Sequence, residues 1–222
     1  MKAKGVTGDL FEDSAAVLPP VESLGEGAVL LRGFATGHDE QLQRELKAIA
    51  QVAPFRHLVT PTGQRMSVAM TNCGPYGWIS DRRGYRYESI DPDSAKPWPA
   101  LPGFFLDLAQ RAATEAGYPN FVPDACLINR YEPGSRLTLH QDKNERDFKE
   151  PIVSVSFGLP AVFLFGGHAR ADRPRRVRLI HGDVAVWGGP SRLNFHGIAP
   201  LADGDHPFMG PYRINLTLRR AR

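Results

Sequence analysis

The chain has 222 residues, of which 42% are hydrophobic and 23% are charged, proportions that exclude collagen-like, fully disordered and multi-span membrane proteins. The length suits one domain with long insertions better than two compact domains. Lysine and arginine total 27 against 24 acidic residues, a net charge of +3, which permits a polyanionic partner without requiring one.

The two cysteines, Cys73 and Cys126, are too few for a disulfide framework and favour a reducing compartment. The start of the chain lacks the basic and apolar regions of a signal peptide, and no segment approaches the ~18 apolar residues of a membrane helix. We therefore expect a cytoplasmic protein that has no membrane partner and acts as a monomer.

The first half of the chain predicts two helices. Residues 1–27, rich in glycine, alanine and proline, are expected to form an arm, and the apolar run 29–31 a strand. Apolar residues recur at helical spacing over 38–54 and over 102–119, and a proline ends each segment. The segment between the helices, 55–100, carries glycine, proline, large rings and the basic group Arg82, Arg83 and Arg86, and is predicted to be irregular.

From residue 123 onward the pattern changes to short strands separated by glycine, proline and aspartate. The predicted strands are 125–131, 136–142, 151–159, 162–167, 176–180, 183–188, 192–198 and 213–219. Their even spacing, with no helical pattern between them, predicts a closed or double-sheet β core and disfavours a parallel βαβ sheet. We expect one integrated α+β domain, mainly β, in which an arm (1–27) and an extension with two helices (28–122) precede a core (123–222).

Two side chains in the predicted strand 136–142 are suited to metal binding. Alternate residues of a strand share a face, so His140 and Asp142 point the same way. A histidine from an adjoining strand would complete a set of two histidines and one carboxylate, the arrangement of non-haem Fe(II) oxygenases; His196 is the candidate. Two alternatives remain: the His140–Asp142 pair is weak evidence by itself, and His181 in a similar His-Gly-Asp motif suits a turn.

The strand 213–219 alternates polar and apolar side chains. Its polar face carries Arg213, Asn215, Thr217 and Arg219. Two guanidiniums around an amide and a hydroxyl are suited to bidentate binding of carboxylates, as a cosubstrate with two carboxylates such as 2-oxoglutarate requires. Upstream, Asn129 and Tyr131 share a strand face and can bind an acid from the opposite wall. A polar face that is simply solvated is the alternative.

The order of these motifs resembles the AlkB family of Fe(II)/2-oxoglutarate-dependent dioxygenases, its bacterial members in particular. The resemblance runs from about residue 28 to 220 and rests on the segments MSVAMTNCG (66–74), PDACLINRY (123–131), HQDK (140–143), PIVSVS (151–156), HGD (181–183), WGG (187–189) and RINLTLR (213–219). It implies a double-stranded β-helix (jelly roll) core with flanking N-terminal helices and a nucleotide-recognition lid, in agreement with the predicted strands and the irregular 55–100 segment.

The resemblance also implies a role for each candidate residue. The iron ligands correspond to His140, Asp142 and His196. The 2-oxoglutarate contacts correspond to Asn129, Tyr131, Arg213, Asn215 and Arg219. The substrate contacts correspond to Trp78, which would stack on a flipped base, Tyr85, which would contact the nucleic-acid backbone, Arg170, near the base pocket, and Asn144. A hydrophobic plug beneath a loop is the alternative role for Trp78.

The reaction implied is oxidative removal of N-alkyl groups from 1-methyladenine, 3-methylcytosine and etheno adducts. The expected substrate is single-stranded DNA, with double-stranded DNA and RNA as further partners. Fe(II), 2-oxoglutarate and O2 would be required, and formaldehyde, succinate and CO2 released. The alternatives are the same chemistry on tRNA or a protein side chain, and a catalytically silent nucleic-acid-binding module.

Two features of the sequence remain open. Asn144 stands where close family members have an aspartate that contacts the exocyclic amine of a cationic base, and an amide lacks that charge. We therefore expect a weaker preference for cationic over neutral lesions. A cluster of five arginines, which either grips phosphates or forms a merely charged hairpin, comprises Arg170, Arg173, Arg175, Arg176 and Arg178.

Overall fold

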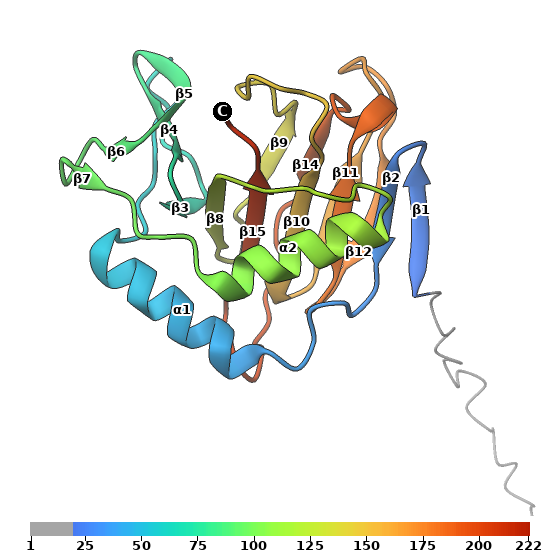
Figure 1. Cartoon of the computed structure of the whole chain (residues 1–222), viewed down its shortest axis with the longest axis horizontal. Helices are drawn as coiled ribbons and strands as arrows, with labels where there is room; N and C mark the ends of the chain where they lie inside the picture. The colour runs from blue at the N-terminus through green and yellow to red at the C-terminus, as the bar shows by residue number, and fades with distance from the viewer. Residues whose placement is uncertain (1–19) are drawn as a thin grey trace, which may run out of the picture.

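The structure, a computed structural model, describes residues 20–222, so most of the predicted arm lies outside the described residues. Two antiparallel sheets face each other (Figure 1). The major sheet has the order β1 (Val21–Gly25), β2 (Ala28–Leu31), β13 (Val184–Trp187), β10 (Ile152–Gly158), β15 (Arg213–Arg219), β8 (Ala125–Tyr131), β3 (Ala69–Cys73). The minor sheet has the order β12 (Arg175–Leu179), β11 (Ala161–Phe165), β14 (His196–Ile198), β9 (Leu137–His140). The predicted jelly-roll core is confirmed.

Both predicted helices are confirmed, as α1 (Asp39–Val52) and α2 (Gly103–Glu115). They lie across the same face of the major sheet (Figure 1). The apolar stripe of α2, including Phe105 and Leu108, packs in one core cluster with Leu216 and Leu218 of β15. The helices therefore cover the outer face of the major sheet, and the minor sheet covers its inner face.

This layering decides the role of the C-terminal strand. All seven residues of β15 are buried, since helices lie on one side and the minor sheet on the other. A solvated polar face, the alternative left open by the sequence, is therefore excluded. The polar side chains of β15 point into the space between the two sheets.

The N-terminal half is more regular than the sequence pattern indicates. Residues 21–25 form β1, although the sequence placed them in an arm; this strand is short, polar and at the sheet edge, so it carries little apolar alternation. The segment 55–100, predicted to be irregular, contains β3 and the short strands β4 (Gly77–Asp81), β5 (Gly84–Glu88), β6 (Ile90–Asp91) and β7 (Lys96–Pro97). Because β1, β2 and β3 belong to the major sheet, the core extends across the expected boundary at residue 122.

One predicted strand is much shorter than expected. Of 192–198, only His196–Ile198 is extended, as β14. Residues 192–195 are not extended because a turn follows the 3-10 helix Gly189–Ser191, closed by a hydrogen bond from the Asn194 N–H to the Ser191 carbonyl at 3.0 Å.

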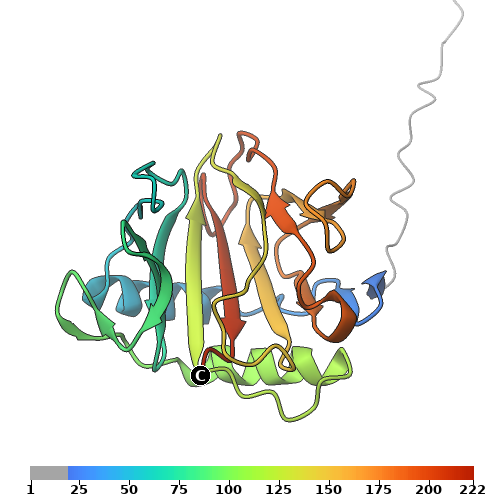
Figure 2. The same ribbon diagram turned by 90° about the horizontal axis from the view of Figure 1, so that it is seen from above.

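A hairpin of β4 and β5, residues 77–88, forms a lid beside the sheets (Figures 1 and 2). Asn72 of β3 fixes its position. The Asn72 side chain accepts a hydrogen bond from the Trp78 backbone N–H and donates one to the Trp78 carbonyl, both at 3.0 Å. The lid is thus attached to the major sheet at Trp78.

Among residues 20–222, neither the length nor the apolar character of any helix suffices for a membrane span.

Candidate metal centre and adjoining pocket

The pairing of β9 with β14 brings the two predicted histidine ligands together. His196 lies opposite His140 in the ladder, and their ring centroids are 4.5 Å apart. Gly197 permits this close approach, because a Cβ there would lie 2.6 Å from the backbone oxygen of Leu137. The lack of a side chain at Gly197 therefore allows β9 and β14 to pack closely enough to bring the two histidines together.

The donor atoms of His140, Asp142 and His196 all lie within 4.8 Å of one another. The Nδ1 of His140 lies 2.9 Å from the Thr138 carbonyl, and the Nδ1 of His196 lies 3.0 Å from the Asn194 carbonyl. A carbonyl can only accept, so each Nδ1 carries a proton and each Nε2 offers its lone pair. The Nε2 atoms lie 3.8 Å and 3.5 Å from the Asp142 carboxylate. Two imidazoles and one carboxylate on one side fit Fe(II).

The electrostatics of the cluster keep His140 and Asp142 in the protonation states that bind a metal. The ring of His140 is partly exposed, but desolvation by the crowded site and the neighbouring His196 lower its pKa to about 4. Burial raises the pKa of Asp142, but Arg219 and the two imidazoles outweigh burial and hold that pKa well below its usual range. At neutral pH, His140 is therefore neutral and Asp142 is ionised.

Arg219 is the charge partner of the Asp142 carboxylate. Its Nη2 and Nε lie 2.5 Å and 3.0 Å from Asp142 Oδ2. Its Nε also lies 3.5 Å from Glu145, which is buried. Arg219 therefore links the candidate metal ligand to a second acid that sequence reasoning did not single out.

Arg192 holds the loop that carries Asp142. The loop 141–150 has no helix or strand, and the buried Arg192 reaches it at three points. Its guanidinium donates to the carbonyl oxygens of Asp142 (2.8 Å) and Glu150 (3.0 Å) and to the carboxylate of Glu145 (3.2 Å). The Tyr87 hydroxyl of the lid donates to the same Glu145 carboxylate at 2.6 Å. One buried acid thus joins lid, loop and core.

The inner face of the major sheet forms a polar wall beside this cluster. Asn215 donates to Ser154 (2.8 Å) and to the Val155 carbonyl (3.1 Å), and accepts from Asn129 (3.3 Å) and Thr217 (2.9 Å). Asn215 is therefore fixed by four hydrogen bonds. The predicted residues Asn129 and Asn215 lie directly opposite each other in the β8–β15 ladder.

Arg213 lies on the same wall and keeps unused donors. Only its Nη2 has a partner, the Ser156 hydroxyl at 2.9 Å. Its Nε and Nη1 are buried without a partner among residues 20–222. The guanidinium lies 5.0 Å from the ring centroid of Tyr131, and burial raises the pKa of Tyr131 to about 12. A buried cation with two free donors beside a protonated phenol fits one carboxylate of a dicarboxylate cosubstrate.

The lid places two aromatic rings beside the cluster. The rings of Trp78 and Tyr85 are stacked, with centroids 5.6 Å apart and planes 13° from parallel. The Trp78 indole N–H donates to the side-chain oxygen of Asn144 at 3.1 Å. Across the minor sheet, the Arg170 guanidinium lies 6.0 Å from the ring of Phe195, the neighbour of His196. The structure thus puts Trp78, Tyr85 and Asn144 together, whereas Arg170 lies beside Phe195, the residue before the ligand His196.

The arginines of the lid are mostly engaged within the lid. Arg86 pairs with Asp81 (2.9 Å) and Glu88 (2.8 Å), and Arg83 pairs with Asp81 (3.4 Å). The hydrogen bond from Arg86 holds the pKa of Asp81 well below its usual range. The basic group of the lid therefore offers less free positive charge than the sequence suggests, because its acids are close in space.

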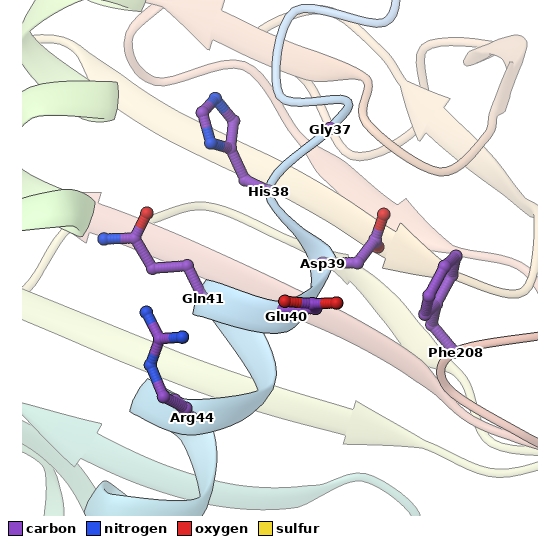
Figure 3. A pocket seen from close by; sticks show the side chains of 7 residues that line it. All are labelled: Gly37, His38, Asp39, Glu40, Gln41, Arg44 and Phe208. Carbon is purple, nitrogen blue, oxygen red and sulfur yellow. The ribbon is translucent and has the colours of Figure 1, made fainter.

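A surface hollow of about 400 Å³ lies elsewhere, at the start of α1 (Figure 3). Asp39, Arg44 and Phe208 are among the residues that line it, and none of the predicted site residues does. The candidate site is therefore identified by its donor set and its unpartnered buried groups. Sequence reasoning did not identify Tyr87, Glu145 and Arg192 as residues of this network. Glu145 and Arg192 gave no signal because a charged residue outside regular structure is ordinarily exposed, and Tyr87 gave none because its partner Glu145 is 58 residues away in the chain.

Comparison with known proteins agrees with this geometry. The family model of the 2OG-Fe(II) oxygenase superfamily matches residues 27–219. The alpha-ketoglutarate-dependent dioxygenase AlkB of Escherichia coli (strain K12) is 58% identical over 213 residues, which are 96% of this chain and 97% of that protein. The tRNA demethylase abh1 of Schizosaccharomyces pombe is 28% identical over 160 residues, covering 65% of this chain and 52% of that protein.

The fold has the same support. The solved structure of OsALKBH1 superposes with a TM-score of 0.81 at 28% identity, covering 90% of this chain and 100% of that one. A match of the family model over most of the chain, together with high identity over nearly its full length, settles the assignment. The chain belongs to the AlkB family of alpha-ketoglutarate-dependent dioxygenases within the 2OG-Fe(II) oxygenase superfamily.

Proposed function

We propose that this dioxygenase removes N-alkyl groups from bases of a single-stranded nucleic acid, with DNA as the main substrate. The observation that carries the proposal is the convergence of His140, Asp142 and His196 next to the Arg213 guanidinium, whose Nε and Nη1 have no partner among residues 20–222. A metal and a dicarboxylate are the two groups that such a pocket fits. Relatives named as an AlkB dioxygenase and as a tRNA demethylase support a nucleic-acid substrate.

In this proposal Fe(II) is held by the Nε2 atoms of His140 and His196 and by the Asp142 carboxylate. Arg213, with the Tyr131 hydroxyl, holds one carboxylate of 2-oxoglutarate, while Asn129, Asn215 and Arg219 line the rest of its pocket. Bound Fe(II) and 2-oxoglutarate, with O2, supply the oxidation that converts an N-methyl group to formaldehyde and yields succinate and CO2. The side chains supply orientation and an enclosed, charge-balanced site.

The lid supplies the substrate side of the site. A base within a duplex cannot reach the metal, so the target must be flipped out or already unpaired. In this proposal Trp78 stacks on such a base, an interaction of about 1–3 kcal/mol per base. Tyr85 contacts the backbone beside it, and Asn144 and Arg170 contribute to the base pocket. This requirement for an exposed base favours single strands.

The fold and the site allow two other functions. The same chemistry could act on tRNA or on a protein side chain. The similarity to a relative named as a tRNA demethylase supports tRNA over a protein side chain. A silent binding module would lack a ligand, whereas all three donors are present. We further propose that the protein acts as a monomer in the cytoplasm, a reducing compartment that suits its two free, buried cysteines.

The test loads the protein with Fe(II) and 2-oxoglutarate without oxygen, then adds O2 and oligonucleotides that carry methylated or etheno bases. The expected readouts are formaldehyde, succinate and the repaired base. Asp142→Ala should abolish 2-oxoglutarate turnover. Turnover that persists in this variant would overturn the metal assignment, and turnover of a methylated peptide in place of the oligonucleotides would overturn the substrate assignment.

A further inference from the structure

Free positive charge gathers on the β11–β12 hairpin. The side chains of Arg170, Arg173, Arg176 and Arg178, here called the hairpin arginines, are exposed. Within residues 20–222 none of them has a carboxylate oxygen inside 4.0 Å. The nearby acid Asp172 turns to the backbone, where its carboxylate accepts from the Ala169 N–H at 3.0 Å. The lid arginines Arg83 and Arg86, by contrast, are paired, as described above.

The hairpin arginines begin beside the candidate metal centre. Phe165 of β11 pairs with His196 on one side and with Arg175 on the other. The loop 166–174 therefore begins directly after Phe165, the residue that pairs with the candidate metal ligand His196. Since neighbouring strands lie about 4.8 Å apart, β12 is only about 10 Å from β14.

The cations then continue along an edge strand. In β12, the outermost strand of the minor sheet, Val177 and Leu179 are buried, whereas Arg176 and Arg178 are exposed. Because Phe165 pairs with both His196 and Arg175, Arg176 and Arg178 project from the outer face of this sheet, opposite to the face that carries His196. The remaining arginine of the strand, Arg175, is paired with Glu22 of β1. Both ribbon views place the lid on one side of the strands and this hairpin on the other (Figures 1 and 2).

We propose that the hairpin arginines bind phosphates on one side of the target base, so that the nucleic-acid strand runs from the lid across the metal centre and around the loop 166–174 to the outer face of β12. The inference rests on the proposed function for the nucleic-acid substrate and adds the path of that strand. Guanidinium groups bind phosphate oxygens in a bidentate way. Such contacts position a strand without reading its sequence.

The test measures binding of a fluorescent, unmodified oligothymidine that is long enough to cover both lid and hairpin. It compares the wild type with the variant Arg173→Gln/Arg176→Gln/Arg178→Gln, which leaves Arg170 in place. Each phosphate contact to a single strand contributes about 0.7 to the slope of log affinity against log salt, so the slope should fall by about 2. An unchanged slope would overturn the proposal.

The matched control is Arg44→Gln/Lys47→Gln/Arg111→Gln, which removes the same three charges from the helices. This control variant should keep the wild-type slope of log affinity against log salt. If its slope falls as much as that of the hairpin variant, the effect is one of net charge in general and the proposal is overturned. So would a hairpin variant that self-associates but binds normally, because its arginines would then only protect a sheet edge.

A methylated nucleoside separates this proposal from the proposed function. It carries no phosphate for the hairpin arginines to bind, so the hairpin variant should release formaldehyde from it at the wild-type rate. A matching loss on the nucleoside would place the effect in the metal centre and overturn the strand path. If the wild type releases no formaldehyde from any oligonucleotide, the proposed function is wrong. If the wild type is active but the hairpin variant has the same salt dependence of binding as the wild type, only the proposed strand path is wrong.

Discussion

The indole N–H of Trp78 donates a hydrogen bond to the side-chain oxygen of Asn144, 3.1 Å away. An indole nitrogen can only donate, so the contact fixes which end of the Asn144 amide faces the lid. The amide nitrogen, a donor, is then the end left for another partner. The residue at this position is thus neutral and has its acceptor already engaged.

The first prediction concerns lesion preference. Asn144→Asp should raise the activity ratio of cationic to neutral lesions, because a carboxylate attracts a positively charged base and accepts from its exocyclic amine. A charge-assisted hydrogen bond is about twice as strong as a neutral one, so a ratio change of several-fold is expected. The measurement is kcat/KM on 1-methyladenine, 3-methylcytosine and etheno oligonucleotides, with Asn194→Asp as control. An unchanged ratio would contradict the role of Asn144.

The second prediction concerns Gly197. A Cβ there would meet the Leu137 backbone oxygen at 2.6 Å, so Gly197→Ala should push β9 and β14 apart and separate His140 from His196. We expect a stability loss of about 1–3 kcal/mol together with weaker metal binding. Thermal unfolding and Mn(II) titration check this. Gly103→Ala, at a site with open space, is the control; normal Mn(II) affinity in Gly197→Ala would refute the packing argument.

The third prediction concerns Arg192. Arg192→Lys keeps the charge but cannot bind Asp142, Glu145 and Glu150 together, so the loop 141–150 should loosen. Loss of such a supporting contact commonly lowers metal affinity about 10–100-fold. Mn(II) titration and hydrogen exchange of the loop report the two effects. Arg146→Lys, an exposed change in the same loop, should alter neither; a tight-binding, protected loop in Arg192→Lys would rule out this role.

The fourth prediction concerns pH. The Nδ1 of His181 accepts from the Gly158 N–H at 3.1 Å. Burial lowers the pKa of His181, as does the stacked His206, whereas Asp39 raises it; the net pKa lies below its ordinary value. As pH falls below about 6.5, the unfolded chain takes up a proton that the folded chain resists, so stability must fall.

Urea unfolding at several pH values on the metal-free protein measures this effect. His181→Gln should reduce the loss of unfolding free energy on going from neutral to acidic pH, because the substituted side chain does not titrate. His168→Gln, at an exposed histidine, is the control. If both variants lose as much stability on acidification as the wild type, His181 is not a source of the pH dependence.

The sequence by itself determined the elements whose pattern is local. Helical spacing located α1 and α2, and alternation located the strands of the core, because a face buried against neighbours must be apolar at the period of its backbone. The alternation at His140 and Asp142 and the polar face of 213–219 also named the groups that the structure brings together. The sequence also offered His196 as the candidate third ligand, and the family resemblance supplied the roles of all these residues.

The tertiary structure decided what depends on partners distant in the chain. It buried both faces of β15, which turned an ordinary polar alternation into a pocket wall where two nitrogens of Arg213 have no partner in the described part of the chain. It joined Tyr87, Glu145 and Arg192 in one network and paired the lid arginines Arg83 and Arg86, whereas the hairpin arginines have no carboxylate partner among residues 20–222. Burial and ion pairing depend on which strands and loops become neighbours in space. A local repeat in the sequence carries no information about those neighbours.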